Sequence, residues 1–162
     1  MQEPTREGTI RFDTRAQFET QLRACLAAAR TRLDLFDPDF AAFPLGAADV
    51  EASLREFFRR GGVLRLALHS PDYVERHYPR FLRLLRDYGH LLDCRRTPQG
   101  LRQLTDSFCI ADELHVVRRF HSAHMRGEAC FAVAQAAELP RQRFEAIWDE
   151  SFPVLQSTST GL

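Results

Sequence analysis

The sequence predicts an α/β fold in which helices flank both faces of a mixed, largely parallel sheet. Short β-prone segments alternate along the chain with segments of helical periodicity, which is typical of parallel strands joined by crossover helices. The segment from Val63 to His69 is apolar except for Arg65, as expected of a strand that is covered on both faces. Two later β-prone segments flank a turn at Asp112, which indicates one antiparallel hairpin.

The composition predicts one compact domain over residues 1–162, with a tail that frays from about residue 154. Of the 162 residues, 44% are hydrophobic, which is enough for a substantial core. No apolar run approaches the roughly 20 residues that a membrane helix requires, and the first residues lack the apolar stretch of a secretion signal. We therefore expect a cytoplasmic protein that has no membrane partner.

The first part of the chain predicts a strand, a helix and a second strand. Gly8–Phe12 is β-prone, and Thr14 with Gln17 forms the capping-box signature that starts a helix. The apolar face of this helix repeats at helical spacing and comprises Phe18, Leu22, Cys25, Leu26 and Ala29. Arg32–Asp37 then has the alternation of a strand that ends at a turn.

The middle of the chain repeats this order. A second helix is predicted from about Asp49 to Arg60, and the two glycines that follow end it. The buried strand Val63–His69 comes next. After Pro71, a helical region has an apolar inner face and an outer face of arginines, and Leu91–Arg96 is predicted as a further strand.

The last part of the chain predicts a loop, the hairpin and a helical end. Thr97–Thr105 is the longest loop candidate, and Phe108–Ala111 and His115–Arg118 form the hairpin. Phe131–Leu139 and Arg141–Ser151 are two helical pieces, separated or kinked at the proline between them.

The basic residues limit the chemistry that the chain can perform. All 22 are arginines, so mechanisms that need a lysine, such as Schiff-base formation or the lysine of a phosphate-binding loop, are excluded. The 22 acidic residues cancel this charge. Only a local patch could therefore recruit nucleic acid or another polyanion.

Polar residues that follow the predicted strands are the candidate ligand-binding residues, because sites in α/β sheets gather beyond the carboxyl ends of strands. They are Asp37, His69, Ser70, Arg96, Arg118, Arg119 and His121. The arginine pairs at 59–60, 95–96 and 118–119 could converge on phosphate oxygens. Neighbouring residues of a strand point to opposite faces, so at most one of each strand pair can join a common pocket.

Neither the cysteines nor the histidines form a specific metal motif. The four cysteines lack any short paired spacing, and we expect reduced, mostly buried thiols. If helical, His121, His124 and Glu128 would place three metal-capable groups on adjoining faces. The familiar helical zinc site has histidines four residues apart, so we favour a polar loop and predict no metal and no other cofactor.

The order of these elements resembles one half of a phospholipase D-type domain. The His-x-Lys-x4-Asp motif of that superfamily supplies a histidine nucleophile, a phosphate-binding lysine and an aspartate, and it lies at the hairpin. Aligning Asp112 with the motif aspartate puts Thr105 at the histidine position and Ser107 at the lysine position. The chain also lacks asparagine, and with it the downstream Gly-Ser-x-Asn element. The segments Phe12–Arg15, Leu35–Asp39 and Pro79–Arg86 resemble an uncharacterised family of small proteobacterial proteins with this degenerate fold.

The resemblance leads to one hypothesis and two alternatives. The leading hypothesis is a noncatalytic phospholipase D-like binding module for a protein partner or a phosphate-bearing ligand, nucleic acid included. The first alternative is a divergent phosphodiesterase or nuclease that uses His69 or His121, and the second is a metal-binding regulatory domain. We expect no enzymatic activity under the leading hypothesis. The resemblance also implies a homodimer with two-fold symmetry.

Overall fold

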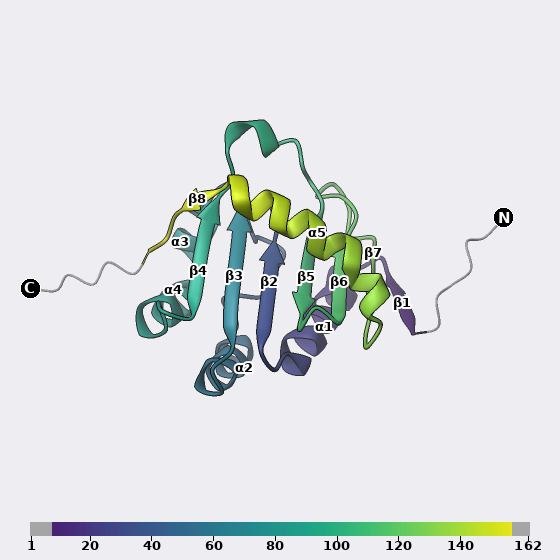
Figure 1. Cartoon of the computed structure of the whole chain (residues 1–162), viewed down its shortest axis with the longest axis horizontal. Coiled ribbons are helices and arrows are strands. Elements are labelled where there is room, and N and C mark those ends of the chain that lie inside the picture. Colours follow the sequence, from purple (N-terminus) through teal and green to yellow (C-terminus); the bar gives the residue numbers. More distant parts are fainter. Residues whose placement is uncertain (1–7, 157–162) are drawn as a thin grey trace, which may run out of the picture.

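The computed structural model describes residues 8–156, which form a single eight-stranded sheet and the helices that pack on it (Figure 1). The strands are β1 (Thr9–Phe12), β2 (Arg32–Phe36), β3 (Val63–Leu68), β4 (Leu92–Arg96), β5 (Ser107–Ala111), β6 (His115–Arg119), β7 (Gly127–Cys130) and β8 (Phe152–Pro153). The helices are α1 (Arg15–Ala28), α2 (Ala48–Arg59), α3 (Asp72–His77), α4 (Pro79–Asp87) and α5 (Ala134–Glu150), with a 3-10 turn at Gln99–Leu101. None of the helices in this described part is long and apolar enough to cross a membrane.

The sheet is mixed, as predicted, and its strand order is β1-β7-β6-β5-β2-β3-β4-β8. Only β2, β3 and β4 pair in parallel, whereas the other five pairings are antiparallel. The expectation that most strands pair in parallel was therefore wrong. The reason is that β5 returns antiparallel beside β2, and the chain then continues as an antiparallel meander through β6 and β7.

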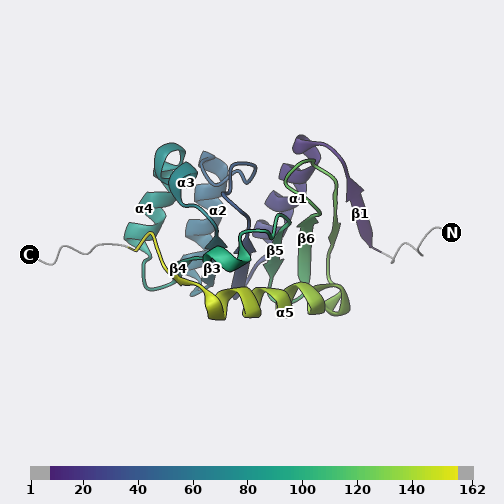
Figure 2. The same cartoon turned by 90° about the horizontal axis from the view of Figure 1, so that it is seen from above.

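The helices divide between the two faces of the sheet, as Figure 2 shows from above. α1, α2, α3 and α4 lie on one face, and α5 alone crosses the other. Buried side chains accordingly form two clusters. The larger includes Phe18 and Leu22 of α1, and the smaller packs Phe144 and Trp148 of α5 against Phe108 of β5.

The predicted start of α1 is confirmed in detail. The Thr14 hydroxyl accepts a hydrogen bond from the Gln17 backbone N–H, and the Gln17 side chain accepts one from the Thr14 backbone N–H. The five predicted inner residues of this helix, Phe18, Leu22, Cys25, Leu26 and Ala29, are all buried. All four cysteines are free and buried, as expected.

The end of the chain differs from the prediction in three places. The helical pieces expected on either side of Pro140 form one helix, α5, which starts later than predicted because Ala132 has a φ of 61° and cannot belong to it. The strands β7 and β8 were not predicted. Val154, where the frayed tail was expected to begin, donates to the Cys94 carbonyl at 3.0 Å and is held by β4, whereas residues 157–162 lie outside the described part.

Candidate functional site

Several candidate residues meet at one edge of the sheet, where β2, β3, β4 and β6 end and β5 and β7 begin. The register that pairs Phe36 with Phe108 and Ser107 with Arg119 brings these strand ends together. The sheet nevertheless separates the candidates, because adjacent residues of one strand face opposite sides. Three distinct clusters result.

The first cluster surrounds Asp37, on the face that carries α1. The Asp37 carboxylate accepts hydrogen bonds from the Ser107 hydroxyl and from the backbone N–H groups of Asp39 at 3.0 Å and Phe40 at 2.6 Å. Phe40 is buried with a φ of 63°, a left-handed conformation that this bond supports. Burial raises the pKa of the Asp37 carboxyl, while these hydrogen bonds oppose the rise. Asp37 therefore holds a turn and is not open to a ligand.

Arg119 completes the Asp37 cluster. Its guanidinium lies 3.7 Å from the Asp37 carboxylate and 5.7 Å from the centre of the Phe18 ring. One guanidinium nitrogen donates to the Met125 sulfur at 3.5 Å, and the buried Nε has no hydrogen-bond partner. The charge of Arg119 is thus balanced mainly by Asp37, in a site that its 6% exposure closes to solvent.

The second cluster surrounds His69, on the face that carries α5, where its ring packs 5.5 Å from that of Phe36. The His69 Nε2 lies 2.6 Å from the carbonyl oxygen of Leu104, and Nδ1 lies 2.5 Å from the Thr97 hydroxyl. A carbonyl oxygen only accepts, so Nε2 carries the proton and donates it. Both ring nitrogens are engaged, and His69 ties the end of β3 to the loop before β5.

The remaining predicted residues at this edge have structural contacts. Arg96 donates to the His69 carbonyl at 3.1 Å, and the Ser70 hydroxyl accepts the backbone N–H of Asp72 at 3.4 Å, where α3 begins. Thr105 is half-buried in the loop before β5. Asp112 lies at the opposite end of β5 from Ser107.

The Asp112 carboxylate accepts the backbone N–H groups of residues 30, 31 and 32 at 2.8–3.0 Å. These hydrogen bonds hold the pKa of Asp112 below its usual range, although burial opposes them. They join the β5–β6 turn to the start of β2. Asp112 is therefore a brace between two strands.

The third cluster is an open groove of about 660 Å³ beside the edge strand β1. It lies among β1, the first turn of α1, and the ends of β6 and β7, elements that Figure 1 places together at one side of the sheet. We call it the arginine groove; its lining residues are Arg11, Phe12, Asp13, Gln17, Arg118, Phe120, Arg126, Gly127 and Glu128.

The arginine groove is built on a three-strand ladder. Arg11 of β1 and Arg118 of β6 both stand opposite Glu128 of β7, so this glutamate has an arginine on each neighbouring strand. Arg118 lies 3.5 Å from Glu128, and the ion pairs of residues 8–156 include none for Arg126. Gly127 permits this close pairing, because a side chain there would overlap the Arg118 carbonyl and the Phe12 ring. Three arginines face two carboxylates, so the groove favours anions.

The histidines near this groove do not form the helical cluster considered above. His121 and His124 lie in the exposed β6–β7 loop, where each Nδ1 accepts a backbone N–H, from Ala123 and Arg126 respectively. Glu128 lies on β7 and pairs with Arg118. Residues 8–156 contain no group of three side chains placed to hold a metal ion. His121 and His124 therefore lie in a polar loop, as we favoured, and β7 begins at Gly127.

Of the predicted ligand-binding residues, only Arg118 lines the arginine groove. Arg11, Phe120 and Arg126 were not predicted to take part in a site. The aromatic Phe120 directly after the pair Arg118-Arg119 was the available signal in the sequence, but only the pairing of β7 brings these residues together with Arg11. Without β7, nothing places Arg11 and Arg118 on one face.

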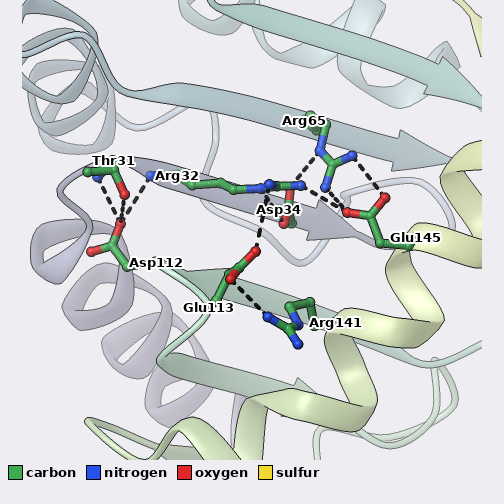
Figure 3. A network of polar contacts seen from close by, with 8 residues as sticks. All are labelled: Thr31, Arg32, Asp34, Arg65, Asp112, Glu113, Arg141 and Glu145. Atoms are coloured by element: carbon green, nitrogen blue, oxygen red, sulfur yellow. Dashed lines mark hydrogen bonds and ion pairs between the residues drawn. The ribbon is translucent and has the colours of Figure 1, made fainter.

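A separate network of charges fastens α5 to the sheet, as Figure 3 shows. Asp34 of β2, which is 1% exposed, accepts hydrogen bonds from Arg32 at 3.1 Å and Arg65 at 2.9 Å. Both arginines also reach Glu145 of α5. Arg65 stacks on α5 as well, 4.9 Å from the centre of the Phe144 ring. Perturbed carboxyls often mark functional sites, but every group in this network has a partner within the chain.

Asp34 is expected to make stability depend on pH. Burial raises its pKa to about 7 despite the opposing charge of Arg32. The unfolded carboxyl titrates at about 4, so its contribution to stability is fully present below about pH 4 and is lost as the pH rises through 7. Between pH 5 and pH 8, the free energy of unfolding of the parent should fall by on the order of 3 kcal/mol because of Asp34. Urea unfolding of Asp34→Asn should lack this fall. An unchanged slope would contradict the raised pKa.

The fold is similar to that of solved phospholipase D-family proteins. Nuc of Salmonella typhimurium, a member of that family, superposes with a TM-score of 0.63 at 13% identity over 83% of this chain and 89% of its own. NucT of Helicobacter pylori gives a TM-score of 0.60 at 9% identity over 90% and 98%. The archaeal chromatin protein TrmBL2 gives 0.66 at 14% identity, with 94% of this chain covering 56% of that one.

A comparison of the sequence with family models assigns the chain to one family. Residues 14–157 match the model of a domain of unknown function, DUF7931, and the chain belongs to this family. No curated protein sequence matches it.

Proposed function

We propose that this protein is a noncatalytic phospholipase D-like module that binds a phosphate-bearing ligand in the arginine groove. The observation that carries the proposal is the ladder Arg11–Glu128–Arg118, joined by Arg126, in an open groove at the edge of the sheet. Guanidinium groups donate paired hydrogen bonds to phosphate oxygens, and the excess of arginine over carboxylate gives the groove the required charge.

Further observations support binding without catalysis. The chain has no lysine, and aligning Asp112 with the motif aspartate puts Ser107 and Thr105 where the phospholipase D motif has its lysine and histidine. Ser107 is buried against Asp37, and both nitrogens of His69 are already bonded. TrmBL2 combines the same fold with DNA binding, which is compatible with a binding role for this chain.

The arginine groove is tested with inorganic polyphosphate, which carries phosphate and no other recognition group. Arg118→Gln and Arg126→Gln should each weaken its binding about tenfold, because each removes a charge-assisted hydrogen bond. Isothermal titration calorimetry at low and high salt would measure both affinity and its salt dependence. Arg76→Gln is the matched control, since Arg76 is an exposed arginine of α3 outside the groove. Equal effects of all three substitutions would reject the groove as the site.

The phosphodiesterase alternative makes an opposite prediction that the same protein can test. It requires turnover of a model phosphodiester, such as bis(4-nitrophenyl) phosphate, and loss of that turnover in His69→Ala or His121→Ala. Our proposal predicts no turnover of this phosphodiester. The homodimer, the protein partner and the cytoplasmic location stay predictions from the sequence.

A further inference from the structure

Phe120 is an exposed aromatic side chain at the rim of the arginine groove. It is 45% exposed, although burying a phenylalanine normally stabilises a fold. Its backbone N–H donates to the Arg126 carbonyl at 3.0 Å, and this bond closes the β6–β7 loop. The backbone of Phe120 is therefore held in place at the rim of the groove.

The surroundings of the Phe120 ring are cationic. The Arg118 guanidinium lies 5.5 Å from the ring centre, and Arg126 lines the same groove. An aromatic face beside an arginine suits a flat group that is joined to phosphate, because stacking and phosphate contacts then act together. Polyphosphate would use only the arginines and leave the ring exposed.

The ladder also sets the span of the phosphate contacts. Neighbouring strands lie about 4.8 Å apart, so the Cα atoms of Arg11 and Arg118, two strands apart, are separated by about 10 Å. A ligand that reaches both must be extended, and Glu128 between them opposes its negative charge. These features favour a flexible chain of nucleotides over a single phosphate group.

We infer that the ligand of the arginine groove is a single-stranded nucleic acid that stacks a base on Phe120 and places its phosphates against Arg11, Arg118 and Arg126. This inference rests on the proposed function and adds the class of ligand. A duplex is excluded from this mode because its base faces are already stacked within the helix.

Fluorescence anisotropy with labelled single-stranded DNA and RNA oligonucleotides of one sequence tests the inference. Phe120→Leu should weaken their binding about tenfold or more, since stacking on an aromatic side chain contributes roughly 1–3 kcal/mol per base. Phe120→Trp should restore it, because an indole also offers a π face. Both substitutions should change the affinity for inorganic polyphosphate far less than Phe120→Leu changes that for the oligonucleotides. Phe120 is exposed, and unchanged thermal melting would show that both variants fold.

Glu128→Gln gives a second test with the opposite sign. Removing the carboxylate between the two arginines should tighten the binding of both the oligonucleotide and polyphosphate several-fold, whereas a cationic partner would bind this variant more weakly. Two results would overturn the inference and leave the phosphate site intact. One is equal affinity for the single-stranded oligonucleotide and its duplex, and the other is an unchanged affinity of Phe120→Leu for the oligonucleotide. Absence of polyphosphate binding would overturn the proposed function itself.

Discussion

Replacing Asp37 by alanine is expected to lower the free energy of unfolding by about 3–5 kcal/mol, because Arg119 would then be a buried charge without a counter-charge. The carboxylate also binds the backbone N–H groups of Asp39 and Phe40 and the Ser107 hydroxyl. All three donors would lose their acceptor in a site closed to water. Urea unfolding at pH 7, followed by circular dichroism, would measure the loss.

Two controls separate the roles of the Asp37 carboxylate. Asp37→Asn keeps one side-chain oxygen for the turn but removes the negative charge, so we expect a smaller loss than with alanine. Asp39→Ala removes an exposed aspartate whose side chain accepts only from the Ala41 backbone N–H, and about 1 kcal/mol is expected. A loss from Asp37→Ala no larger than that from Asp39→Ala would contradict the assignment of Asp37 as the centre of a buried cluster.

Most of the fold could be predicted from the sequence because periodicity and capping are local. The start of α1 needs only Thr14 and Gln17, and the burial of β3 follows from its apolar run. β7 escaped prediction because Gly127–Cys130 has no β-branched residue and obtains its conformation from β1 and β6 on either side. The same reason applies to β8, a two-residue strand held by β4.

The site could be predicted only in part, because it depends on which face each strand residue occupies. The sequence placed Asp37, His69 and Arg118 near one edge, and the structure does bring the ends of β2, β3 and β6 together there. The pleat then separates them: Asp37 and Arg119 face α1, while His69 faces α5. Arg118 acquires its neighbours only from the register of β1 and β7.

The two faces of the sheet therefore carry different clusters of polar side chains at this edge. On the α1 face, Asp37, Ser107 and Arg119 form a buried cluster that is closed to solvent. On the α5 face, His69 is fixed between Thr97 and Leu104. Beside β1, by contrast, the arginine groove is open and is lined by three arginines.

The network below α5 provides the second large expected effect, for Arg65→Met. Methionine keeps an unbranched apolar chain against Phe144 but leaves the buried Asp34 with Arg32 alone, so we expect a loss of about 3 kcal/mol at pH 8, where Asp34 is ionised.

The loss from Arg65→Met should shrink at pH 5, because Asp34, with its pKa raised to about 7, is then protonated and needs no counter-charge. In the double variant Asp34→Asn/Arg65→Met, the two losses should not add, which urea unfolding of all four proteins would reveal as a coupling energy. Arg60→Met removes an exposed pair with Glu56 and should cost less than about 1 kcal/mol at either pH. A loss from Arg65→Met that is the same at both pH values and additive with Asp34→Asn would show that α5 is held by its apolar contacts alone.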